Sequence, residues 1–126
     1  MTLDVLPGRL AVSRLTPSAS VASWMGEGAL SSVTRTDAEL SVVCDEAAVP
    51  AGVTVEGGWR ALRVRGPLAF ELTGILADLA HTLAEAGVSI FAVSTFDTDV
   101  VLVKADRLDD AADALRAAGH EVVSGG

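Results

Sequence analysis

The order of helix-like and strand-like segments in the second half of the chain constrains the fold most. Residues 73–86 place apolar side chains three and four positions apart, as an amphipathic helix does, and residues 107–118 repeat that spacing. Each segment runs into a glycine, Gly87 or Gly119, which commonly ends a helix in the left-handed conformation. We therefore predict two helices, with Thr73 as the N-cap of the first.

Short runs rich in valine, isoleucine and phenylalanine flank both predicted helices and are typical of β-strands. They cover residues 59–65, 88–96, 100–104 and 121–123. The turn at residues 97–99 is short enough to join the middle two strands as a hairpin. The order is then β-α-β-β-α-β, which predicts an α+β, ferredoxin-like fold with both helices on one face of an antiparallel sheet.

The first half of the chain follows a shorter version of this pattern. Its candidate segments are a strand at 9–15, a short helix or turn at 19–25, and a hairpin formed by 31–36 and 39–44. The small residues Pro50-Ala51-Gly52 and Gly57-Gly58 then predict a loop where a second helix could stand. We therefore expect an abbreviated βαββ unit at residues 1–56 and a complete unit at residues 57–126, packed together as one body.

Charge and composition exclude several classes of partner. The 126 residues carry 17 acidic and 9 basic side chains, a formal net charge of -8. Such a chain repels nucleic acid and anionic membrane surfaces, since both are bound mainly through lysine and arginine. The N-terminal residues show no signal-peptide pattern, and no stretch is apolar enough to span a membrane. A single cysteine cannot form an internal disulfide. We expect a cytoplasmic protein.

Motifs that perform chemistry are missing or incomplete. The glycines of residues 26–28 lack the third glycine of a dinucleotide-binding loop. His81 and His120 have no Cys, His or Glu at metal-ligand spacing, so we expect both on the surface. Cys44 ends an apolar run and is typical of a buried hydrophobic residue. We therefore expect no catalytic residues, no metal and no cofactor, and predict that the protein is not an enzyme.

One group of residues still suits a ligand. Gly74 and Ile75 open a predicted helix, whose unpaired backbone N–H groups and positive dipole end favour a carboxylate. Asp97 and Asp99 leave the following strand and suit an ammonium or guanidinium group. A zwitterionic amino acid carries both a carboxylate and a cationic group, so it would suit both sets of residues. The two aspartates also fit a divalent cation site, or simply the turn of a hairpin.

The same residues resemble a known family, the ACT-domain regulatory modules. The resemblance lies within the aspartate-kinase-like branch, which includes the cytosolic arginine sensors called CASTOR and short bacterial stand-alone relatives. It rests on the segments Trp59-Arg60-Ala61-Leu62, Gly66 to Phe70, Thr73 to Leu76, Leu83 to Asp99 and, upstream, Ser32 to Thr36 with Glu39 to Val43. The Ser-Thr-Phe-Asp-Thr-Asp run at residues 94–99 is its most specific part.

The resemblance implies that a free amino acid binds at an interface between two ACT units, without catalysis. In the arginine sensors the ligand lies against the start and the exit of the second strand and near a glycine at a helix start. Together with the reasoning from the residues, this gives the candidate ligand-binding residues Gly74, Ile75, Ser89, Ile90, Thr95, Phe96, Asp97 and Asp99. It also implies a homodimer, because the chain carries one complete unit.

A second hypothesis remains beside this one. The same fold could serve as a structural or interaction protein, in which the ligand pocket is vestigial and one face binds a partner enzyme. The two hypotheses differ in one simple observation, since only the first requires the chain to respond to free amino acids.

Overall fold

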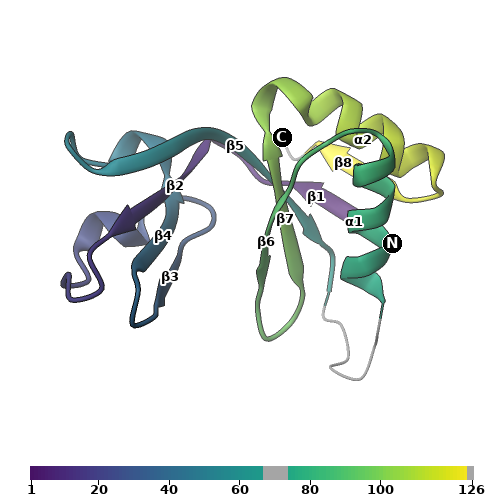
Figure 1. The fold of residues 1–126 in the computed structure, drawn as a ribbon. Coiled ribbons are helices and arrows are strands. Elements are labelled where there is room, and N and C mark those ends of the chain that lie inside the picture. Colours follow the sequence, from purple (N-terminus) through teal and green to yellow (C-terminus); the bar gives the residue numbers. More distant parts are fainter. Residues whose placement is uncertain (67–73, 125–126) are drawn as a thin grey trace. The chain divides into compact units, whose positions relative to one another are not determined.

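A computed structural model describes residues 1–66 and 74–124, and these form two compact units (Figure 1). Unit 1 contains Met1–Leu6 and Arg60–Gly126, and unit 2 contains Pro7–Trp59. Each unit is built around its own β-strands.

Unit 1 is a five-stranded sheet covered by two helices. Its elements are β1 (Thr2–Val5), the second half of β5 (Thr54–Val64), α1 (Ile75–Glu85), β6 (Phe91–Ser94), β7 (Asp99–Lys104), a short 3-10 helix η3 (Ala105–Arg107), α2 (Leu108–Ala117) and β8 (Glu121–Ser124). The strand order is β6-β7-β5-β1-β8. This confirms the predicted α+β, ferredoxin-like class. Neither helix in the described part of the chain is long and apolar enough to cross a membrane.

The core of unit 1 lies between its helices and its sheet. Leu79 and Leu83 of α1 and Leu115 of α2 are fully buried there, as their helical spacing predicts. They pack in one cluster with apolar side chains from β1, β5, β7 and β8. The predicted N-cap of α1, Thr73, lies outside the described residues.

The N-terminal strand β1 is the main departure from the predicted organisation. It pairs with β5 on one side, antiparallel, and with β8 on the other side, parallel. The predicted division into residues 1–56 and 57–126 therefore differs from the division in the structure. The structure places Met1–Leu6 in unit 1, and the rest of that unit starts at Arg60. Four residues alternating polar and apolar are a weak strand signal, yet Leu3 and Val5 are buried in the core of unit 1.

Unit 2 has the strand order of a small ferredoxin-like sheet, with 3-10 helices in place of α-helices. Its elements are β2 (Leu10–Leu15), η1 (Ser23–Gly26), β3 (Ser32–Arg35), β4 (Leu40–Asp45), η2 (Glu46–Ala48) and the first half of β5. The order is β3-β4-β2-β5, so β5 supplies a strand to each unit. Its core contains Met25, Leu40, Val42 and Cys44.

Gly57 and Gly58 lie inside strand β5, not in the predicted loop. Pairing between β2 and β5 shifts register there, since Leu10 faces Trp59 while Val12 faces Glu56. This is a β-bulge, and Gly58 adopts the positive φ of 79° that such a bulge requires. A Cβ at Gly57 would overlap the Glu46 carboxylate, which accepts a 2.6 Å hydrogen bond from the Gly58 N–H.

An ion pair between β1 and the end of β5 makes the stability of unit 1 sensitive to acid. Arg65 donates to both carboxylate oxygens of Asp4, at 3.1 and 2.5 Å, and this lowers the pKa of Asp4 below its ordinary value of 3.8. The stabilisation is therefore present above pH 3.8 and is lost as the pH falls through the lowered pKa. We expect Asp4→Asn to flatten the acid limb of the stability curve, measured by urea unfolding between pH 2 and 6. An unchanged acid limb would contradict this.

Candidate ligand site

Gly74 stands directly before the first residue of α1. Its φ is 82°, in the left-handed region where glycine is favoured, and its carbonyl accepts a 2.8 Å hydrogen bond from the Asp78 N–H. Among the described residues other than its two chain neighbours, no heavy atom lies within 4 Å of the place where a Cβ at Gly74 would stand. A ligand can therefore approach the backbone closely here, beside the N–H groups of the first helical turn, which have no acceptor within the helix.

The turn between β6 and β7 is built by its own hydroxyl and carboxylate groups. Ser94 and Asp99 face each other as the last strand pair, and the Ser94 hydroxyl donates to Asp99 Oδ1 at 2.7 Å. The Thr95 N–H and hydroxyl both donate to the Thr98 carbonyl, at 2.8 and 3.0 Å. Asp99 Oδ1 thus stabilises the hairpin by accepting the bond from Ser94. The second oxygen, Oδ2, takes no part in that bond.

Thr98 is a residue of this turn that the sequence analysis does not select. Its hydroxyl donates to the carbonyl of Val64 at 2.6 Å, and Val64 is the last residue of β5. This bond holds the turn against the strand that leads into α1. The only signal in the sequence is the run of residues 94–99 itself, because a backbone acceptor 34 positions away has no sequence pattern.

The predicted site residues fall into two groups at opposite ends of β6. The start of α1 and the β6–β7 turn lie at the same end of unit 1 (Figure 1), which places Gly74 and Ile75 at that end with Thr95, Phe96, Asp97 and Asp99. Ser89 and Ile90 precede β6 at its other end. Five residue steps along β6 lead from Ile90 to Thr95, which separates the two groups by about 17 Å. One copy of unit 1 does not bring all eight residues together.

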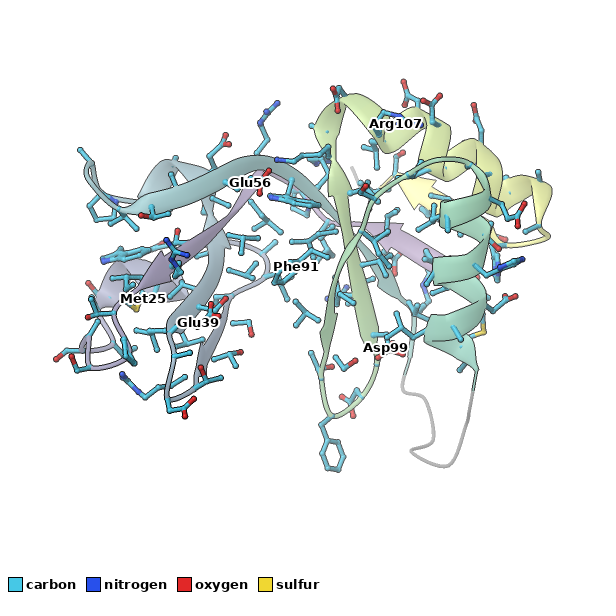
Figure 2. All side chains as sticks on the ribbon, viewed as in Figure 1. Met25, Glu39, Glu56, Phe91, Asp99 and Arg107 are labelled. Carbon is cyan, nitrogen blue, oxygen red and sulfur yellow. The ribbon has the colours of Figure 1, made fainter. Side chains whose placement is uncertain are left out.

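Phe96 and Asp97 form the exposed tip of the turn. The Phe96 ring is 78% exposed, so it is not a core residue of unit 1. Asp99, labelled in Figure 2, is half-buried at the start of β7. The tip therefore presents an aromatic ring and a carboxylate outward, while Asp99 lies closer to the sheet.

The segment before β6 is fixed by an arginine that the sequence analysis does not select. Arg107, labelled at the start of α2 in Figure 2, donates to the carbonyls of Ala86 and Gly87 at 3.4 and 3.2 Å. These carbonyls lie where α1 has ended, so the guanidinium satisfies acceptors left free by the helix. Arg107 thereby fixes the backbone that leads into Ser89 and Ile90. Ser89 is exposed, whereas Ile90 packs against the core of unit 1.

The other reactive side chains considered in the sequence are Cys44, His81 and His120. Burial raises the pKa of the Cys44 thiol, which disfavours the thiolate that a nucleophile needs. His81 is exposed as predicted, but His120 is not, since its side chain is only 9% exposed and its Nε2 lies 3.3 Å from Asp78 Oδ2. Within residues 1–66 and 74–124, no three His, Cys, Asp or Glu side chains are placed to hold a metal ion.

Comparison with known proteins identifies the family. The family model for the ACT domain matches residues 54–117, slightly more than half of the chain. A second family model, which describes an N-terminal domain, matches residues 8–52. The chain belongs to the ACT-domain family, as the resemblance in its sequence predicts.

Solved structures share the fold of this chain. A crystal structure of an Agrobacterium tumefaciens protein matches with a TM-score of 0.93 and 39% identity, over 99% of this chain and 93% of that one. The regulatory subunit of aspartate kinase from Thermus thermophilus matches with a TM-score of 0.61 over 92% of this chain and 93% of that one. At 11% identity, the second match concerns the fold alone.

The chain is also similar to part of a mammalian sensor. The human cytosolic arginine sensor for mTORC1 subunit 1 is 39% identical over 59 residues, which is 46% of this chain. The bovine protein matches to the same extent. This alignment spans only 18% of the length of either sensor.

Proposed function

We propose that this protein is a regulatory module that binds a free amino acid at an interface between two ACT units and performs no chemistry. One observation carries the proposal. The candidate residues lie at opposite ends of β6, so a site that uses all of them requires a second copy of unit 1.

Strand β6 offers an edge on which a second copy could pair. It is the last strand of the order in unit 1, and β7 is the one strand that pairs with it in the described part of the chain. Two copies related by a twofold axis would pair their β6 edges antiparallel. Such pairing places the start of β6 in one copy beside the exit of β6 in the other, and the two groups of residues then meet twice in one homodimer.

The groups that meet there have complementary chemistry. The start of α1 and the open side of Gly74 suit the carboxylate of an amino acid. Ser89, which is exposed, and the partly buried Ile90 can offer their backbone groups to the ligand's polar atoms. Asp99 Oδ2 suits a cationic group, either the ammonium or a basic side chain. Phe96 can cover the ligand, since its ring is exposed at the same turn.

The relatives support this function. One is named a cytosolic arginine sensor and another is the regulatory subunit of a kinase. Arginine is therefore the first amino acid to test, and the cytoplasm is the proposed location.

A thermal-shift screen against the twenty amino acids tests the proposal. Ligand at a hundredfold excess over its Kd stabilises the chain by about 2.7 kcal/mol, which raises the melting temperature by roughly 10 °C. We expect one amino acid, or a few of similar chemistry, to produce such a rise. The N-acetyl and carboxamide derivatives of the responding amino acid are the controls, and both should lose the effect because each removes one charge.

A flat response to all twenty amino acids at millimolar concentration would contradict the proposal. The interaction protein with a vestigial pocket would then be the better account, and capture of one partner enzyme irrespective of amino acids would support it.

A further inference from the structure

Unit 2 has an open pocket of about 580 Å³ that none of the candidate residues in unit 1 lines. It lies where β2 ends and β5 begins, with Arg14 and Thr54 facing each other as a cross-strand pair. Residues from the turn after β2, including Thr16 and Pro17, complete its lining. Its volume is within the range of about 300–1,000 Å³ that small-molecule sites occupy.

Arg14 is an exposed arginine of unit 2 that has no partner among the residues the structure describes. The unit contains three basic side chains, Arg9, Arg14 and Arg35. Arg9 pairs with Glu46 at 3.3 Å, and Arg35 donates to backbone carbonyls. The guanidinium of Arg14 has no hydrogen bond or ion pair with any residue in 1–66 or 74–124. An arginine without a counter-charge in a pocket can receive an anion through two parallel N–H groups.

The turn after β2, which lines the same pocket as Arg14, is held in place before any ligand arrives. Arg35 donates to the carbonyl of Pro17, and to that of Ala19 at 2.8 Å. The Ala19 N–H in turn donates to the carbonyl of Thr16 at 3.0 Å. This turn therefore keeps its shape without help from a ligand, which lowers the entropic cost of binding.

The lining defines the class of ligand. Thr16 and Thr54 line the pocket with hydroxyls, and Leu15, Pro17 and Val53 line it with apolar surface. Unit 2 also carries six acidic residues, Glu27, Asp37, Glu39, Asp45, Glu46 and Glu56, so a multiply charged anion is disfavoured. We propose that this pocket binds a small monocarboxylate with an apolar tail, through Arg14. This inference does not depend on the function proposed for unit 1.

An NMR titration of the ¹⁵N-labelled full chain with 3-methylbutanoate tests it. We expect saturable shift changes at the amides of residues 15–17 and 52–54, and none with the neutral 3-methylbutanamide. Arg14→Gln should weaken binding at least tenfold, and Arg14→Lys should restore part of it. Arg63→Gln is the matched control, because it removes the same charge from an exposed position in unit 1.

Four results would overturn the proposal. One is equal binding by Arg14→Gln and the unaltered chain, and another is an equal response to the acid and its amide. The third is tighter binding of inorganic phosphate in the same pocket, which would replace the carboxylate class. Shift changes confined to unit 1 would also overturn it, while pointing to the site around Gly74 and Asp99.

Discussion

Replacing Asp99 with asparagine is expected to weaken binding of the responding amino acid at least tenfold. A hydrogen bond to a charged partner contributes about 1.5–3 kcal/mol, and each 1.4 kcal/mol is a tenfold change in Kd. Asparagine keeps an oxygen that can accept the 2.7 Å hydrogen bond from the Ser94 hydroxyl, so the hairpin should persist. Isothermal titration calorimetry gives the affinity, and circular dichroism checks the fold.

The control for this substitution is Asp109→Asn, which removes an equal charge from an exposed position in the first turn of α2. It should leave the affinity unchanged. Unchanged affinity in Asp99→Asn as well would mean that Asp99 serves only the hairpin turn, as its bond to Ser94 allows.

The largest loss of stability is expected from Leu83→Ala. Leu83 is fully buried, and it packs in the cluster that joins both helices of unit 1 to the sheet. Truncating a buried leucine costs about 2–5 kcal/mol, since it removes apolar contacts and leaves a cavity. Urea unfolding should show this loss. Val21→Ala is the control, because Val21 is 62% exposed and its change should stay within about 0.5 kcal/mol.

A loss below 1 kcal/mol for Leu83→Ala would show that α1 does not pack on the sheet as described. The position is informative because Leu83 also accepts through its carbonyl at the end of α1, from the N–H groups of Ala86 and Val88. The substitution keeps those backbone bonds, so the measured loss reports side-chain packing.

Periodicity predicts most of unit 1, because its two helices each bury one apolar stripe. Leu79, Leu83 and Leu115 occupy the core positions that their spacing requires. Periodicity does not predict the position of strand β1. Its place between β5 and β8 depends on pairing partners about 60 and 120 residues away along the chain. Two adjacent glycines usually mark a loop, so the sequence predicts one at Gly57 and Gly58. In the structure they form a bulge beside Glu46 instead.

The sequence predicts which residues are candidates for ligand binding, but it does not predict how far apart they lie in the fold. Asp99 and Ser89 are ten positions apart, and only the course of β6 shows that they stand at opposite ends of a strand. Thr98 and Arg107 could not be selected in advance, because both bind backbone carbonyls that tertiary structure brings near. That Arg14 has no partner within residues 1–66 and 74–124, whereas Arg9 and Arg35 have theirs, likewise cannot be predicted from the sequence.

Mixing two binding-deficient variants tests most directly whether the site is shared between two copies. Ser89→Trp blocks the start of β6 and Asp99→Asn alters its exit, so neither homodimer should bind the responding amino acid normally. In a mixed dimer, both changes fall in one site and the other site is intact. Calorimetry of the mixture should therefore recover the Kd of the unaltered chain at a reduced number of sites. A mixture that forms mixed dimers by native mass spectrometry, yet binds no better than either variant alone, would contradict the shared site.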